Sequence, residues 1–250
     1  MVIRIPQVCR SIRLRAAQKA IGTSSQGFWD IRQERTASTK SSSKRKAVDN
    51  AVRSPDAPND SEHSDTATYA AYAQRSGLDT TSTTYVGTHY EYQVASTLKR
   101  LGFDLKRIGG RGDFGIDLVG TWAVPSNPSP LRVIVQCKAA ATKTMIGPRL
   151  VRELEGAFVG APPGWRGQGV VGLLVAQKPA TKGVRDSLGR SRWPMGFISC
   201  LSDGKLQQML WNHQAEDQGL AGLGVGIRFS EGDHNAQELI LTFQGKPSTP

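Results

Sequence analysis

Cysteine is scarce in this sequence: the chain contains Cys9, Cys137 and Cys200 and no Cys-x-x-Cys pair. An odd count without paired spacing argues against a disulfide scaffold or a zinc ribbon and indicates a reducing compartment. Long apolar runs are also absent, since none approaches the roughly 20 residues that cross a bilayer. We therefore expect a soluble chain with no membrane span.

Acidic residues are absent from the start of the chain, where none precedes Asp30. The formal charge of +11 is uneven, with +9 in residues 1–53, −4 in 54–84 and +6 in 85–250. An Arg-rich, acid-poor beginning that can form an amphipathic helix is typical of a mitochondrial transit peptide. We assign residues 1–35 to such a peptide and expect a mitochondrial, matrix location. A basic disordered tail, or a nuclear signal built on 44-KRK-46, is the alternative.

Large aliphatic residues are rare from position 36 to 84, where Ser, Thr, Asp, Ala, Asn and Pro dominate. Such a segment buries too little apolar surface to offset its chain entropy, which predicts a disordered linker. The folded domain is expected to begin near Tyr85 and to extend to about residue 245.

Helical and extended patterns alternate within this domain. Apolar spacing and capping residues predict helices at 88–101 and 148–158, with helix-like segments at 181–189 and 203–211. Strands are predicted at 103–108, 116–122, 131–138, 170–176 and 196–201, and a hairpin at 223–230 and 237–244. The runs 170-VVGLLVA-176 and 196-GFISCL-201 are typical of strands covered on both faces. The pattern predicts an α/β fold with a mixed sheet.

Three polar side chains stand in apolar strands and require an explanation. Gln136 and Lys138 in 133-VIVQCKA-139 share one strand face, and an adjacent strand can place Asp117 of 116-IDLV-119 beside them. A carboxylate, an amide oxygen and an ammonium together suit a divalent metal and a water. The alternative for Lys138 is a solvated edge strand. Cys137 faces the other way, which favours core packing.

Two further acids have simpler explanations. Glu91 lies three residues after Thr88, so a capping box accounts for it as well as a role in the site does. Asp113 is interpreted as a turn residue rather than a ligand.

The order of motifs resembles a known family. Glu91 in 90-YEYQVASTLKRLGF-103, then 112-GDFGIDLVG-120, then 135-VQCK-138 resembles the Mrr-like, type IV restriction endonuclease branch of the PD-(D/E)xK nuclease fold. The likeness covers roughly residues 85–212 and includes the later ELEG helix. With the Arg-rich start and the Ser-rich linker, the chain is most similar to fungal mitochondrial proteins named for a requirement in respiratory growth.

The resemblance implies a three-layer, restriction-endonuclease-like fold with a central mixed β-sheet flanked by helices. It implies that Asp117, Gln136 and the backbone carbonyl of Cys137 hold Mg²⁺ or Mn²⁺, and that Lys138 orients the attacking water. Glu91 would assist through a water or a second metal. Gln136 stands where many members of the fold carry an acid.

Function is expected to be metal-dependent hydrolysis of DNA in support of respiratory growth. The alternative is a catalytically inactive, nucleic-acid-binding accessory factor in mitochondrial genome maintenance or expression, and a third hypothesis has the basic patches bind a protein. Basic residues expected to contact phosphate lie on both sides of the site: Lys99, Arg100, Lys106, Arg107, Arg111, Arg149, Arg152, Arg185, Arg190 and Arg192. Trp122, Trp165 and Trp193 are expected either to stack on bases or to pack.

Overall fold

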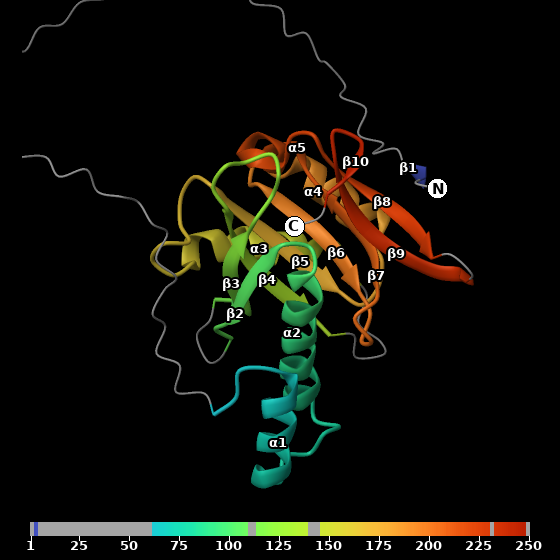
Figure 1. Ribbon diagram of the computed structural model, residues 1–250. Helices are drawn as coiled ribbons and strands as arrows, with labels where there is room; N and C mark the ends of the chain where they lie inside the picture. The colour runs from blue at the N-terminus through green and yellow to red at the C-terminus, as the bar shows by residue number, and fades with distance from the viewer. Residues whose placement is uncertain (1–2, 5–61, 110–113, 140–145, 231–232, 249–250) are drawn as a thin grey trace, which may run out of the picture. The chain divides into compact units, whose positions relative to one another are not determined.

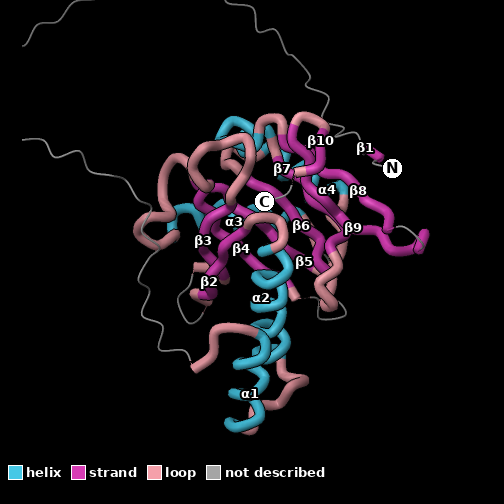
Figure 2. Tube along the Cα trace, in the orientation of Figure 1, coloured by secondary structure: helices cyan, strands magenta, loops and turns pink. Residues whose placement is uncertain are grey.

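The computed structural model describes residues 3–4, 62–109, 114–139, 146–230 and 233–248. Within them, six strands form one sheet in the order β2-β3-β4-β5-β6-β7. The strands are β2 (Phe103–Arg107), β3 (Leu118–Trp122), β4 (Leu131–Lys138), β5 (Val170–Ala176), β6 (Met195–Cys200) and β7 (Leu206–Trp211). The sheet is mixed, because β4, β5 and β6 run parallel while β2, β3 and β7 pair antiparallel. Figure 2 shows the strands in magenta and the helices in cyan.

Helices cover both faces of this sheet. Helix α2 (Thr83–Lys99) packs on one face, while α3 (Pro148–Gly160) and α4 (Lys182–Arg190) pack on the other (Figure 1). Every residue of β5 and β6 is buried between these layers, which explains their continuous apolar sequences. The expected α/β fold, with a central mixed sheet flanked by helices, is confirmed.

A second sheet lies on the same face as α2. Among the described residues it contains β1 (Ile3–Arg4), β8 (Leu223–Ser230), β9 (Asp233–Phe243) and β10 (Lys246–Pro247). Leu223 of β8 and Leu239 and Leu241 of β9 join the core beneath α2, so the predicted C-terminal hairpin is confirmed. Short helical turns, α5 (His213–Ala215) and η1 (Glu216–Leu220), connect the two sheets. Strand β1 falls in the range expected to be a transit peptide, whose other residues lie outside the described ones.

The helix expected at 203–211 is wrong, because the chain forms β7 there and pairs with β6. Leu206, Met209 and Leu210 have the spacing of a helix face, but short apolar segments are ambiguous in this respect. Gly204 has a φ of +83° and permits the tight turn that folds β7 back on β6. Pairing with β6 therefore decides the structure of this segment.

The expected start of the domain near Tyr85 is also wrong. Helix α1 (Thr66–Ser76) lies within the range assigned to a disordered linker, and α2 begins at Thr83 rather than at 88. Asp65 and Thr68 form a capping box, and Gly77 ends α1 in a left-handed conformation. Aromatic residues rather than aliphatic ones supply the burial: the Tyr69 ring packs 5.3 Å from that of Tyr85.

A hydrogen bond fixes the segment before α1 to α2. His63 Nδ1 lies 2.7 Å from the Tyr92 hydroxyl, which also donates to the His63 carbonyl. Burial, together with the nearby charge of Arg107, lowers the pKa of His63, so its neutral imidazole pairs with Tyr92. His63 thus has a structural role. The rest of the expected linker lies outside the described residues.

Candidate functional site

Asp117 is held by backbone groups from two directions. It directly precedes β3, its N–H donates to the Val135 carbonyl at 2.9 Å, and its own carbonyl accepts from the N–H groups of Ile108 and Gly109. Its carboxylate Oδ2 accepts from the Cys137 N–H at 2.6 Å. The half-buried carboxylate is therefore fixed against β4, as the sequence predicts.

Gln136 and Lys138 lie on the face of β4 that α3 covers. Their neighbour Ile134 belongs to the α3-side core, whereas Val133 and Val135 belong to the α2-side core, so the predicted alternation is confirmed. Gln136 is 4% exposed, and its Oε1 has no hydrogen-bond donor among the described residues. A buried amide oxygen without a donor is costly, which marks this position as unusual.

Glycine at position 115 makes room for the Gln136 amide. A Cβ there would lie 3.0 Å from Gln136 Nε2, and the residue has a φ of +79°. Any other residue would be strained in this conformation and would crowd the amide. The glycine-rich turn before β3 thus contributes directly to the geometry of the site. Residues 110–113, including Arg111 and Asp113, lie outside the described residues, so the turn role assigned to Asp113 stays a prediction.

The Lys138 ammonium reaches across to α3. Its Nζ lies 3.5 Å from Glu153 Oε2, and Glu153 Oε1 accepts from Arg149 Nε at 2.8 Å. Desolvation raises the pKa of Glu153, but the Arg149 hydrogen bond and the charge of Lys138 outweigh it and hold this pKa below its ordinary value. Glu153 is the partner that sequence reasoning missed. It stands in the ELEG segment that carried part of the resemblance, although no local pattern links it to Lys138.

The capping-box explanation of Glu91 is wrong. Ser82 caps α2, which leaves Thr88 buried inside the helix rather than at its start. Glu91 Oε2 instead lies 2.5 Å from Arg107 Nε, and Arg107 Nη2 also reaches the Thr88 hydroxyl. A Cβ at Gly109 would lie 3.3 Å from Glu91 Oε2 and 3.5 Å from the Asp117 Cα, so Glu91 and Asp117 both border this glycine.

Cys137 contributes its backbone rather than its sulfur. Its side chain packs against the α2-side core, as expected from strand alternation. Burial raises the pKa of the Cys137 thiol well above its ordinary value, and the carboxylates of Asp117 and Glu91 add to this effect. A neutral thiol is a poor nucleophile and a poor metal ligand.

The donors gathered here suit a hard cation. Within the described residues no three His, Cys, Asp or Glu side chains gather as a metal site. The candidate set is instead the Asp117 carboxylate and the Gln136 amide oxygen, with the backbone carbonyl of Cys137, the residue that follows Gln136. Oxygen ligands of this kind are those that Mg²⁺ prefers, and the unpaired Gln136 Oε1 fits that use.

Several residues expected to contact nucleic acid have other partners. Arg107 and Arg149 pair with Glu91 and Glu153, and Arg185 donates to the Ala180 carbonyl. Trp122 and Trp165 are buried and pack in the hydrophobic core. Trp193 is 39% exposed, with its ring stacked 4.8 Å from that of Phe158. The described basic residues that remain exposed include Lys99, Arg152, Arg190 and Arg192.

No helix in the described part of the chain is both long and apolar enough to cross a membrane. This observation agrees with the absence of long apolar runs from the sequence.

The chain is similar to a known protein family and to a mitochondrial protein of a fission yeast. Residues 82–129 and 124–226 match the family model described as required for respiratory growth protein 7. An uncharacterized mitochondrial protein of Schizosaccharomyces pombe is 34% identical over 157 residues, which cover 61% of each chain. The chain therefore matches about three fifths of that relative's length.

Among solved structures, the MspJI restriction endonuclease in complex with a 27-mer oligonucleotide overlaps 52% of this chain and 29% of its own. The TM-score is 0.33 and the identity 17%. This overlap is partial and low, so the fold assignment depends on the chain's own sheet order and helix placement.

Proposed function

The chain belongs to the required for respiratory growth protein 7 family, and we propose that it is a metal-dependent nuclease that hydrolyses phosphodiester bonds in mitochondrial DNA. Asp117, Gln136 and Lys138 form the centre of the proposed site, with Glu91 at its border.

The observation that carries this proposal is the buried Oε1 of Gln136, which has no hydrogen-bond donor within the part of the chain that the structure describes. Leaving a buried acceptor without a donor costs about 1–3 kcal/mol, so an apolar residue of similar size should be at least as stable at this position. A bound cation would use that oxygen together with the Asp117 carboxylate, which is held by the N–H of the next residue, Cys137, and would thereby remove the penalty. The amide oxygen without a donor among the described residues supports a metal site more directly than the resemblance does.

Each residue has a defined task in this proposal. Asp117, Gln136 and the Cys137 carbonyl would hold Mg²⁺ or Mn²⁺, and the ion would supply Lewis-acid activation of the phosphate and of the attacking water. Lys138 presents a point charge that stabilises negative charge developing on the phosphate. Glu153 keeps that ammonium on the α3 side of β4, at 3.5 Å. Glu91, oriented by Arg107, would accept a hydrogen bond from a water near Asp117.

A mitochondrial location is part of the proposal. The S. pombe relative is named as mitochondrial, and the family name refers to respiratory growth. The first 29 residues lack acids and contain several arginines, which fits import into the matrix. The expected substrate is therefore the organelle's own DNA.

A second candidate function is supported by a different observation. Lys138 and Glu91 are both engaged in ion pairs, and Gln136 brings no formal charge to the metal position. A site with these properties suits an accessory factor that binds nucleic acid without cleaving it. Such a factor would still act in genome maintenance or expression.

Cleavage assays separate these functions. The full chain is incubated with supercoiled plasmid and with single-stranded DNA in Mg²⁺ or Mn²⁺, beside Asp117→Ala and Lys138→Ala. Lys182→Ala is the matched control, because Lys182 pairs with Asp186 on the exposed surface of α4. Cleavage that is lost in the first two variants and kept in the third supports the nuclease. DNA binding without cleavage by every protein supports the accessory factor, and no binding at low salt contradicts both.

A further inference from the structure

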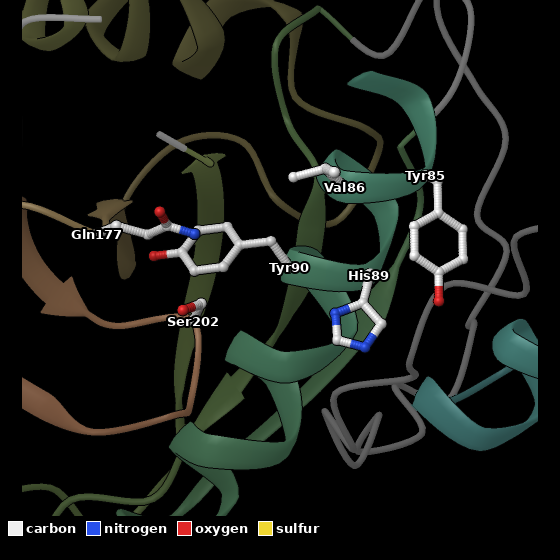
Figure 3. Close-up of a pocket in the computed structure, with 6 residues that line it drawn as sticks. All are labelled: Tyr85, Val86, His89, Tyr90, Gln177 and Ser202. Atoms are coloured by element: carbon white, nitrogen blue, oxygen red, sulfur yellow. The ribbon is translucent and has the colours of Figure 1, made fainter. Parts of the chain in front are cut away.

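A small pocket lies where the first half of α2 meets the chain after β5 and β6 (Figure 3). Its volume is about 130 Å³, and its walls are Tyr85, Val86, His89, Tyr90, Gln177 and Ser202. Four of these residues come from α2, while Gln177 directly follows β5 and Ser202 comes soon after β6. The proposed nuclease site uses none of them.

The pocket opens at the same edge of the sheet as the proposed site. Lys138 is paired in register with Ala176 of the parallel strand β5, and Ala176 is paired with Ser199 of β6. Gln177 therefore follows directly after Ala176, the residue of β5 opposite Lys138. Neighbouring strands of a sheet are about 4.8 Å apart. The pocket lies on the α2 side of the sheet, whereas Lys138 points to the α3 side.

The walls combine flat rings with a few polar groups. The rings of Tyr85 and His89 stack 5.8 Å apart with an interplanar angle of 26°. The Tyr90 hydroxyl donates to the Cys200 carbonyl at 2.7 Å, which fixes the orientation of that ring. Gln177 and Ser202 supply an amide and a hydroxyl on the opposite side, as Figure 3 shows. Apolar and aromatic walls with a few convergent polar groups are typical of small-ligand pockets.

We propose that this pocket binds an unpaired nucleobase of the DNA strand whose phosphate lies at the nuclease site. Bases stack on aromatic rings whatever their sequence, and an amide can pair with the edge of a base. A base inside a duplex cannot reach such a pocket without leaving its stack. This inference rests on the proposed function and narrows its substrate class to single-stranded or frayed DNA.

Binding measurements without catalysis test the inference. Fluorescence anisotropy is measured in EDTA with the full chain and three probes of equal length: a labelled single strand, the same strand with abasic sites, and the duplex. Val86→Trp and Ser202→Trp fill the pocket from two exposed positions, so at least one of them should fold normally. Ser96→Trp, on an exposed position of the same helix, is the matched control.

The wild type and Ser96→Trp should bind the ordinary strand on the order of tenfold more tightly than the abasic strand, as stacking of a base allows. Val86→Trp and Ser202→Trp should bind both strands equally. The inference is overturned if the wild type shows no preference for the ordinary strand, if both filled variants keep that preference, or if the duplex binds as tightly as the single strand.

These outcomes are independent of cleavage. Failure of Asp117→Ala and Lys138→Ala to reduce cleavage contradicts the proposed nuclease without changing the base preference measured in EDTA. Loss of the base preference in the filled variants supports the pocket even in a protein that does not cut. A peptide or another small ligand as the true occupant would leave the two DNA strands indistinguishable to the wild type.

Discussion

Replacing Gln136 with methionine tests the metal site through stability rather than through activity. Methionine is close to glutamine in size and removes the buried Oε1, for which the described residues supply no donor. Relief of that acceptor is worth about 1–3 kcal/mol, while loss of interactions of the amide nitrogen costs about 1 kcal/mol. Gln136→Met should therefore be as stable as the wild type or up to about 2 kcal/mol more stable in the absence of metal. A domain of this size should show a rise in Tm of up to roughly 4–8 °C.

Magnesium should narrow this difference in stability. A ligand present at about ten times its Kd stabilises the folded state by about 1.4 kcal/mol, or roughly 3–6 °C in Tm. The wild type should gain this amount when Mg²⁺ is added, because Asp117 and Gln136 bind it together. Gln136→Met should gain little, since one of its two side-chain ligands is absent.

Differential scanning fluorimetry with and without Mg²⁺ provides the measurement. The control is Gln208→Met, because Gln208 Oε1 already accepts a hydrogen bond from the Ala180 N–H at 2.8 Å. This variant should lose about 1 kcal/mol and keep the full response to Mg²⁺. An equal Mg²⁺ response in the wild type and in Gln136→Met would refute the metal site. A loss of more than about 3 kcal/mol in Gln136→Met would show that Oε1 has a structural partner.

Two further predictions concern the surroundings of the site. Gly115→Ala should lower the free energy of unfolding in urea by about 1–2 kcal/mol or more, since residue 115 has a φ of +79° and an added Cβ would lie 3.0 Å from Gln136 Nε2. Gly77→Ala is the control, because residue 77 has a φ of +63° and open space around it. This variant should show the backbone strain alone and keep the Mg²⁺ response. An equal loss of stability and an equal Mg²⁺ response in both variants would contradict the role of Gly115. Glu153→Gln should destabilise by about 0.2–1 kcal/mol at neutral pH and reduce cleavage less than Lys138→Ala does. The pKa of Glu153 in the folded state is below its ordinary value of 4.5, so its contribution to stability is complete above pH 4.5 and is lost as pH falls through the folded-state pKa. A difference in unfolding free energy between wild type and variant that persists in stronger acid would argue against the ion pair.

Most of the central sheet was predictable because its strands carry their signal locally. The segments at 131–138 and 170–176 coincide with β4 and β5, and β6 begins one residue before its expected start. Continuous apolar sequence in β5 and β6 indicated burial on both faces, and every residue of both strands is buried. The placement of Gln136 and Lys138 on one face followed from strand alternation alone.

Elements that depend on distant partners were predicted less well. The apolar spacing of residues 206–211 by itself fits a helix. Antiparallel pairing with β6 makes this segment the strand β7. Helix α1 contains little aliphatic surface, and its stability depends on tyrosines that pack against α2 and on the bond between His63 and Tyr92. The role of Glu91 was misjudged for the same reason, since Arg107 reaches it from β2.

The sequence by itself determined the α/β class, the family and the identity of Asp117, Gln136 and Lys138 as unusual polar residues, because burial and strand alternation are encoded in neighbouring positions. Only the tertiary structure decided which charges neutralise one another, that Gln136 Oε1 has no donor among the described residues, and that aromatic rings of α2 line a pocket with residues that follow β5 and β6. Ion pairs, orphaned acceptors and pockets arise between elements far apart in the chain, and their energies depend on distances of a few ångströms that no local pattern contains.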